Sequence, residues 1–199
     1  RLYVAGFSLG GNVVAKWLGE APEAVPEAVA GAAVVSVPYD LAASAEHFEV
    51  SLRGAYSWRF MRSLIPKAIE KERQYPGSLD LERVRRSRSF ADFDTHATAA
   101  LHGFRDAEEY WAKSSSGQFV GAIRRPLLLI SALDDPFVPA SSLPWDAAEE
   151  SDYLHGLFTR AGGHVGFVYG RWPWGVRYWA EEQVVRFFEN YELRITNYE

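Results

Sequence analysis

The chain has 199 residues, which is long enough for one domain with a sizeable core and an insertion. With 48% hydrophobic and 15% aromatic residues it is typical of a globular protein, and its net charge of -5 argues against nucleic acid or an anionic membrane surface as the main partner. The absence of cysteine excludes disulfides and thiolate chemistry.

The sequence shows no sign of membrane insertion or export. Its longest apolar stretch, Ala28 to Val37, is far shorter than the roughly 18 residues that a membrane-spanning helix needs, and no signal peptide is present. These features favour a cytoplasmic protein. However, the chain begins at Arg1 and its only methionine is Met61. We therefore expect the N-terminus to be a cut edge, beyond which a targeting or anchoring segment could lie.

The chain opens with a predicted strand, turn and helix. Leu2 to Gly6 is a short apolar run that ends in glycine, as a buried parallel strand does. The period of the hydrophobic pattern then changes. Five apolar residues follow at helical spacing and predict a helix with one apolar stripe. These are Leu9, Val13 and Trp17, with Val14 and Leu18 beside them. Gly19 and Pro22 end this helix, and the small and β-branched run from Val29 to Val37 predicts the second strand.

A different composition marks the region from about Asp40 to Gly121. It is rich in arginine, glutamate and aromatic residues, and its apolar residues follow a helical period, as between Tyr56 and Met61. We therefore predict a helical cap insertion at about 40–121, inside a single partial domain that covers residues 1–199.

The sheet resumes after this insertion. Pro126 to Ser131 predicts a strongly apolar strand, Asp146 to Glu150 a surface helix, and Tyr153 to Thr159 the last strand. A closing helix is predicted from apolar residues at i, i+3, i+4 and i+7, namely Val184, Phe187, Phe188 and Tyr191. Strands that alternate with helices predict the α/β class, with a doubly wound and mostly parallel sheet.

The pentapeptide Gly6-Phe7-Ser8-Leu9-Gly10 matches the G-x-S-x-G nucleophile elbow. In this motif the serine lies on a strained strand-to-helix turn, and small residues two places on either side let the strand and the helix approach each other. The geometry makes the backbone N–H of Leu9 one oxyanion donor, at the positive end of the helix. The alternative is a plain glycine-rich turn. A P-loop is disfavoured because Asn12 follows Gly11 where a lysine should stand.

A serine hydroxyl is a weak nucleophile that needs a base and an orienting carboxylate. In this fold the order along the chain is serine, acid, histidine, and Ser8, Asp135 and His164 meet it. Asp135 follows the strand that ends at Ser131, where open α/β sheets place functional groups, and it begins a D-x-x-x-P turn. Its neighbour Asp134 is the competing acid. His164 lies in a glycine-rich loop after the last strand.

Other polar and aromatic groups have simpler interpretations. His47, His96, His102 and His155 are expected to be surface or core groups, and no metal-ligand spacing is present, so we expect no metal and no other cofactor. Asp92 and Asp94 beside His96 are expected to serve as caps or ion-pair partners. A basic run is expected to be a solvated face, and four aromatic residues near the C-terminus to pack the last helix on the sheet, with an acyl pocket as their alternative. The basic run is Arg83, Arg85, Arg86 and Arg88, and the aromatic set is Trp172, Trp174, Tyr178 and Trp179.

Four spaced motifs carry a resemblance to a known family. They are Gly6-Phe7-Ser8-Leu9-Gly10-Gly11-Asn12, Ser36-Val37-Pro38-Tyr39-Asp40-Leu41, Ala132-Leu133-Asp134-Asp135-Pro136-Phe137 and Gly162-Gly163-His164-Val165-Gly166-Phe167. These motifs resemble the YheT-like family, the fourth AB-hydrolase family, and the resemblance covers essentially the whole chain. It implies an α/β-hydrolase fold and hydrolysis of carboxylic esters, with short- or medium-chain acyl groups. On the family pattern Ser8 is the nucleophile, His164 the base, and Asp134 or Asp135 the acid.

One departure from that fold stands out. Several strands and the second oxyanion donor normally precede the elbow, whereas almost nothing precedes it here. Losing one donor typically costs about 10²–10³ in rate, and an uncovered strand edge favours aggregation. We therefore expect N-terminal strands to be missing and this polypeptide alone to be inactive or poorly folded.

The resulting hypothesis is a serine hydrolase that acts on a small-molecule ester or a lipid-like substrate through an acyl-enzyme. The helical insertion is expected to cover the site and select the acyl chain, as lids do. Two alternatives are open: an enzyme for thioesters, amides or acyl transfer, and a non-catalytic binding protein with the same fold.

Overall fold

The computed structural model describes residues 1–50, 55–171 and 174–196. The chain forms two compact units. Arg1–Tyr39 and Ser115–Glu199 make a unit built around a sheet, and Asp40–Ser114 make a helical unit.

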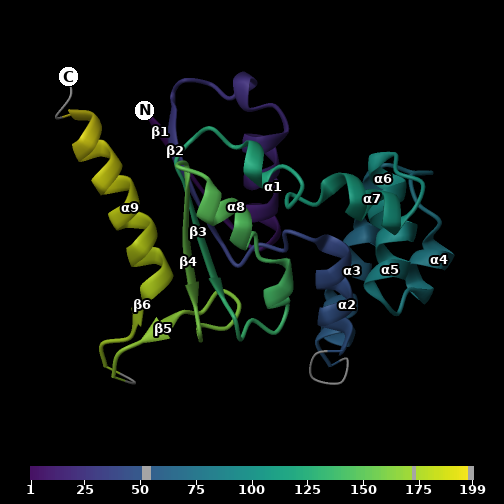
Figure 1. Ribbon diagram of the computed structural model, residues 1–199. Coiled ribbons are helices and arrows are strands. Elements are labelled where there is room, and N and C mark those ends of the chain that lie inside the picture. Colours follow the sequence, from purple (N-terminus) through teal and green to yellow (C-terminus); the bar gives the residue numbers. More distant parts are fainter. Residues whose placement is uncertain (51–54, 172–173, 197–199) are drawn as a thin grey trace. The chain divides into compact units, whose positions relative to one another are not determined.

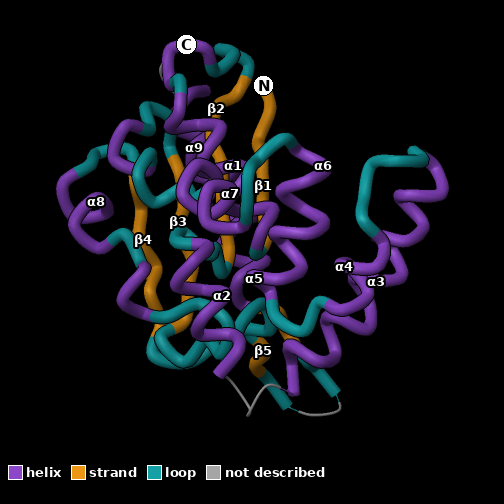
Figure 2. The backbone as a smooth tube through the Cα atoms, turned by 90° about the vertical axis from the view of Figure 1, so that its right-hand side faces the viewer, coloured by secondary structure: helices purple, strands orange, loops and turns teal. Residues whose placement is uncertain are grey.

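Within the described residues, the main sheet has four parallel strands: β1 (Leu2–Phe7), β2 (Val29–Val35), β3 (Leu127–Ala132) and β4 (Leu154–Thr159). They lie in the order β1-β2-β3-β4, so that β1 and β4 are outermost (Figure 2). The register pairs Val34 of β2 with Gly6 on one side and Leu129 on the other. The carboxyl ends of the strands therefore meet at one edge of the sheet, where functional groups gather in open α/β folds.

The inner strands are apolar on both faces because helices cover both faces. Alternate residues of β2 and β3 enter two separate cores. Val34 and Leu129 face the core that includes Leu18, whereas Val35 and Ile130 face the core that includes Val184. Figure 1 shows the same layers, with α1 (Leu9–Glu20) and α8 (Trp145–Glu150) on one side of the sheet and α9 (Trp179–Thr196) on the other. The predicted doubly wound, parallel α/β sheet is confirmed.

The helix α1 lies where the sequence predicts it, but only part of its apolar stripe is buried: Leu18 belongs to the core and Val14 packs against it. Leu9, Val13 and Trp17 are 50%, 61% and 41% exposed. The buried face consists of Gly11, Asn12, Ala15, Leu18 and Gly19. Small residues line this face because its contacts are close: a Cβ on Gly11 would lie 3.2 Å from the backbone oxygen of Gly6 in β1, and a Cβ on Gly19 would lie 2.2 Å from that of Phe119.

The last helix is joined to the strand β1 near its start. The hydroxyl of Tyr3 donates to Glu192 Oε2 of α9 at 2.6 Å. Burial, together with this carboxylate, raises the pKa of Tyr3 to about 12. In return, the hydrogen bond from Tyr3 is the main influence that lowers the pKa of Glu192.

A short antiparallel pair, β5 (Val168–Tyr169) and β6 (Arg177–Tyr178), precedes α9 and is absent from the sequence prediction. The expected packing of the nearby aromatic residues is right only for Trp179, which stacks on Phe167 at 5.9 Å between ring centroids. It is wrong for Trp174, which is 83% exposed, and for Tyr178, which is 51% exposed, because both belong to this surface hairpin. Trp172 lies outside the described residues.

The helical unit contains α2 (Leu41–Val50), α3 (Ala55–Gln74), α4 (Leu81–Arg86), α5 (Phe90–Phe93), a π-helical turn (Asp94–Ala99), α6 (Ala100–His102) and α7 (Ala107–Ser114). It has a core of its own, formed by Met61, Ala68, Leu79, Val84, Phe93 and Ala97. The unit ends at Ser114, so that residues 115–121, which the sequence assigns to the insertion, belong to the sheet unit.

Polar residues of the helical unit have structural partners. Asp92 forms a capping box with Ser89, and Asp94 accepts hydrogen bonds from Thr98 and from the indole of Trp111 at 2.8 Å. Burial raises the pKa of Asp94. The arginines of α4 are exposed, as predicted.

In the described part of the chain, no helix is both long and apolar enough to cross a membrane. No group of three or more His, Cys, Asp or Glu side chains in that part is arranged to hold a metal ion.

Candidate active site

Ser8 occupies a strained turn between β1 and α1. Its φ is 51° and its ψ is -126°, a conformation that residues other than glycine rarely adopt. The turn is anchored to the sheet because the Ser8 N–H donates to the carbonyl of Val35 at 2.8 Å. The serine therefore lies at the carboxyl end of the sheet, at the N-terminus of a helix.

Two glycines make this turn possible, and they are not the pair that the motif suggests. A Cβ on Gly6 would lie 2.7 Å from the oxygen of Gly10 and 2.7 Å from the Cα of Gly11. A Cβ on Gly11 would lie 2.5 Å from a methyl group of Val37. A Cβ on Gly10, in contrast, would have no neighbouring atom within 4 Å. The close approach of strand and helix thus depends on Gly6 and Gly11. The expectation that it also requires a small residue at position 10 is wrong.

The structure brings Ser8, His164 and Asp135 together from three separate segments. His164 Nε2 lies 2.8 Å from Ser8 Oγ. The other ring nitrogen, Nδ1, lies 2.8 Å from Asp135 Oδ2 and 3.1 Å from Oδ1. The Asp135 side chain is fully buried, and that of His164 is 15% exposed. A continuous line of hydrogen bonds therefore runs from a buried carboxylate to a serine hydroxyl.

Asp135 is fixed by the turn that it begins. Its Oδ1 accepts the backbone N–H groups of Phe137 at 2.8 Å and Val138 at 3.2 Å. Phe137 also packs its ring edge to face with the imidazole, 4.7 Å between centroids. These contacts hold the carboxylate and the ring in one orientation without using the carboxylate oxygen that faces Nδ1 most closely.

Asp134 points elsewhere, although it is adjacent in the chain. Its Oδ1 accepts the N–H groups of Gly162 and Gly163, each at 2.9 Å. Asp134 therefore binds the backbone of the loop that carries His164, whereas Asp135 binds the ring.

Leu9 is the first residue of α1, so its N–H has no acceptor within the helix. The N-terminal N–H groups of a helix favour negative charge. This N–H belongs to the residue that directly follows Ser8.

Ser36 is a residue of this region that the sequence analysis did not assign a role. It follows β2, is fully buried and has a φ of 54°. Its Oγ donates to the backbone carbonyl of His164, and its N–H donates to the carbonyl of Ile130 at 2.8 Å. The signal that could have revealed it is its position at the carboxyl end of an inner strand, beside the elbow.

The remaining histidines lie elsewhere. His155 Nε2 is 2.7 Å from the hydroxyl of Tyr191, and His96 Nδ1 is 3.4 Å from Ser87 Oγ. His47 belongs to α2 and His102 to α6.

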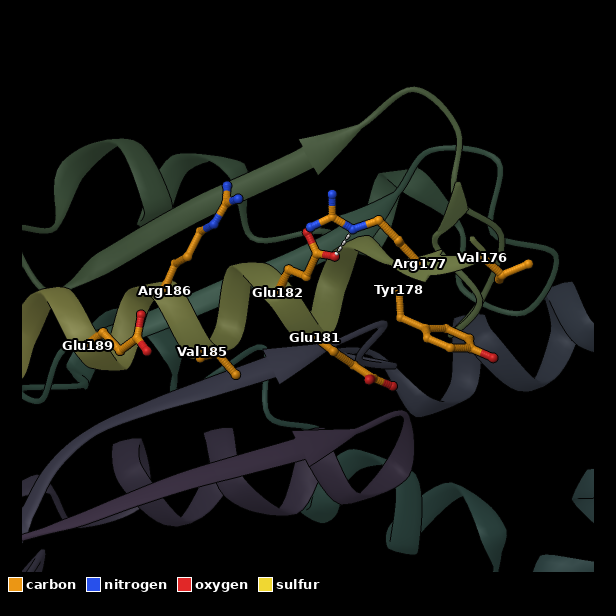
Figure 3. A pocket seen from close by; sticks show the side chains of 8 residues that line it. All are labelled: Val176, Arg177, Tyr178, Glu181, Glu182, Val185, Arg186 and Glu189. Carbon is orange, nitrogen blue, oxygen red and sulfur yellow. Dashed lines mark hydrogen bonds and ion pairs between the residues drawn. The ribbon is translucent and has the colours of Figure 1, made fainter. Parts of the chain in front are cut away.

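The sheet unit also has two surface pockets, here called hollows, that differ from this site. The one in Figure 3 lies on β6 and α9, and it includes the ion pair between Arg177 and Glu182 at 2.8 Å. None of the three hydrogen-bonded residues lines it. A second hollow lies along the His164 loop and includes Asp134, Gly162 and Phe167. The lining of neither hollow includes Ser8, Asp135 or His164, so the candidate site is defined by its hydrogen bonds.

Comparisons with known proteins agree with the fold. A family model described as "alpha/beta hydrolase fold" matches residues 1–170. The chain is 34% identical to YheT of Escherichia coli strain K12, over 83% of this chain and 48% of that protein. It is 30% identical to a monoacylglycerol lipase of Saccharomyces cerevisiae, over 98% of this chain and 44% of that protein, and 28% identical to the mouse phospholipase ABHD3, over 85% of this chain and 41% of that protein.

Among solved structures, the Pyrococcus furiosus esterase Pf2001 has the same fold, with a TM-score of 0.51 at 17% identity, over 98% of this chain and 54% of that one. The chain spans less than half the length of the three relatives named above. The family match covers most of the chain, and the parallel sheet and its strand-to-helix turn agree with it. The chain belongs to the α/β-hydrolase family, and within that family it resembles YheT.

Proposed function

We propose that the protein is a serine hydrolase that cleaves carboxylic esters through an acyl-enzyme. The observation that carries the proposal is the hydrogen-bonded line from Ser8 Oγ to His164 and on to buried Asp135, with distances of 2.8 Å at both steps. Nucleophile, base and orienting acid in this geometry are the requirements for activating a serine hydroxyl.

In the first half-reaction the Oγ–H proton of Ser8 passes to His164 Nε2 as Oγ attacks the ester carbonyl carbon. The carbonyl oxygen becomes an oxyanion, which the N–H of Leu9 stabilises. His164 then returns the proton to the departing alcohol oxygen, the carbon–oxygen bond of the ester breaks, and Ser8 carries the acyl group.

In the second half-reaction water takes the place of the alcohol. His164 removes a proton from the water, the hydroxide oxygen bonds to the acyl carbon, and the Ser8 oxygen leaves with the proton from Nε2. Asp135 accepts the hydrogen bond from Nδ1–H throughout and stabilises the imidazolium that forms in each half. The residues named here perform every step, and none of the steps needs a cofactor.

The substrate class is proposed from the relatives and not from the site. Proteins with similar sequences carry the names phospholipase and monoacylglycerol lipase. We assign to this protein a lipid-like ester with a short- or medium-chain acyl group.

The test is hydrolysis of a series of p-nitrophenyl esters from acetate to decanoate by the full-length protein. A burst of p-nitrophenol equal to the enzyme concentration, followed by slower turnover, is expected if deacylation limits the rate. Ser8→Ala should lower kcat by about 10⁴-fold or more, whereas the matched control Ser141→Ala, an exposed serine of another segment, should not.

The outcomes separate the alternatives. Turnover of thioesters or transfer to added alcohol in preference to hydrolysis would replace the esterase assignment by a thioesterase or an acyltransferase. A folded protein that hydrolyses none of these esters, and that binds them unchanged, would indicate a binding protein.

A further inference from the structure

The loop that carries His164 is held by its backbone as well as by its imidazole ring. The loop follows β4, the outermost strand on its side of the sheet. Gly163 in this loop has a φ of 65°, and Val165 and Gly166 are exposed. Such a segment has many accessible conformations, so that something other than its own sequence must fix where the ring lies.

On one side, a carboxylate fixes the start of the loop. Asp134 Oδ1 accepts two consecutive N–H groups, those of Gly162 and Gly163, at 2.9 Å each. Hydrogen bonds to an ionised acceptor are stronger than neutral ones. Since Asp134 is covalently adjacent to Asp135, the same turn fixes both the backbone and the ring of the loop.

On the other side, the hydroxyl of Ser36 donates to the carbonyl of His164 itself. Ser36 is fully buried, its N–H is bonded to Ile130, and its own backbone is held in the left-handed region. Removal of the hydroxyl would take this donor away from the partly buried carbonyl of His164. The preceding residue, Val35, accepts the N–H of Ser8. The end of β2 therefore touches both the serine turn and the histidine loop.

We infer that Asp134 and Ser36 are positioning residues, which together clamp the backbone of the His164 loop so that Nε2 faces Ser8 Oγ. This inference rests on the proposed function for its catalytic consequence, although the clamp itself is a property of the fold. Neither residue touches the reacting atoms. Each acts through His164, by limiting where the imidazole can move.

The kinetic test uses the full-length protein and a p-nitrophenyl ester. Asp134→Ala should lower kcat by about 10–100-fold, because small misplacements of a catalytic group cost rates of this size, while KM changes by less than about 2-fold. Asp134→Asn keeps an oxygen that can accept both N–H groups, so it should restore most of the kcat that Asp134→Ala loses. Asp146→Ala, which removes an exposed carboxylate from α8, is the matched control for loss of charge.

Ser36 is tested with two variants that separate its hydroxyl from its backbone conformation. Ser36→Ala and Ser36→Gly both remove the donor, but glycine tolerates the positive φ. Equal losses of kcat in the two variants are expected if the hydroxyl matters. The double variant that combines Ser36→Gly with Asp134→Ala should lose less kcat than the product of the two single fold-losses, because both residues restrain one loop. An unchanged kcat in Asp134→Ala or Ser36→Gly would overturn the clamp, as would an Asp134→Asn that loses as much as Asp134→Ala.

Hydrogen exchange of the 160–167 segment, measured by mass spectrometry, tests whether the loop backbone is clamped and does not depend on enzymatic activity. Asp134→Ala should speed exchange of this segment by at least about 10-fold, and Asp134→Asn by much less. If no ester is hydrolysed but exchange behaves in this way, the proposed function fails and the clamp stands. If wild-type hydrolysis is observed and exchange in Asp134→Ala is unchanged, the clamp fails and the proposed function stands.

Discussion

Ser8 lies beside the outermost strand β1, whereas Asp135 and His164 lie on loops that follow β3 and β4. We call these the nucleophile side, formed by β1, the Ser8 turn and α1, and the base side, formed by residues 133–138 and 160–167. On the base side, side chains fix backbone: Asp134, Asp135 and Ser36 together bind five main-chain groups. On the nucleophile side, the turn is held by close packing of glycines and by a hydrogen bond between backbone groups, from the Ser8 N–H to the Val35 carbonyl.

The difference has a physical reason. A base must keep one ring orientation while it gains and loses a proton, and directional hydrogen bonds provide that. A serine on a strained turn needs instead that two backbone segments approach within contact distance, which only residues without a side chain allow. The two sides should therefore fail in different ways when they are altered.

The largest difference is expected between the two neighbouring acids of the base side. Asp135→Asn should lower kcat by about 10³–10⁴-fold, because an amide does not stabilise the imidazolium. Asp134→Asn keeps its acceptor and should cost far less. Steady-state hydrolysis by the full-length protein measures both, and a larger loss in Asp134→Asn would reverse the roles given to the two carboxylates.

The two faces of α1 provide the next contrast, on the nucleophile side. Leu18 is fully buried and Val13 is 61% exposed. Leu18→Ala should therefore lower the free energy of unfolding by about 2–5 kcal/mol, and Val13→Ala by no more than about 0.5 kcal/mol. Urea unfolding monitored by tryptophan fluorescence measures both. Equal losses would mean that the exposed stripe is covered in solution.

Substitution of two glycines of the Ser8 turn, Gly6 and Gly10, should change the free energy of unfolding by different amounts. Gly6→Ala would force a Cβ against backbone atoms at 2.7 Å, and such overpacking should cost about 1–3 kcal/mol or more. Gly10→Ala meets no atom within 4 Å and lies in α1. It should change the free energy of unfolding by less than about 1 kcal/mol, in the stabilising direction. A Gly10→Ala variant that is as unstable as Gly6→Ala would show that the turn is packed differently.

The sequence predicted the order of strands and helices because hydrophobic period is a strong local signal, as in Leu127 to Ala132. The apolar stripe did not reveal which of its residues are buried: close packing buries Gly11, Ala15 and Gly19, whereas the larger Leu9, Val13 and Trp17 are exposed. No local pattern reports how closely two elements pack.

The candidate site shows the same limit. Ser8, Asp135 and His164 could be named from motif and order along the chain, because those motifs are local. The contacts of Ser36 and Asp134 could not be, since each joins segments that are 128 or 28 residues apart. Such contacts follow from the strand order, which a single sequence does not fix.

The smallest expected effect concerns how β1 is tied to α9. The hydrogen bond from Tyr3 is the main cause that lowers the pKa of Glu192 in the folded state. A carboxyl with a lowered folded pKa contributes stability above its unfolded pKa of about 4.3, and this contribution is lost as the pH falls through the folded value. Tyr3→Phe should therefore lower the melting temperature at pH 7 slightly, and the difference from wild type should shrink below pH 4. A difference that grows on acidification would contradict this contact.

The central claim is that Ser8 is a nucleophile activated by His164. A fluorophosphonate probe, which phosphonylates activated serines, tests it when the labelled full-length protein is mapped by peptide mass spectrometry. One adduct on the peptide that contains Ser8 is expected, with labelling abolished in Ser8→Ala and slowed strongly in His164→Ala. Labelling that persists in Ser8→Ala, or a folded wild-type protein that takes up no label, would contradict the claim.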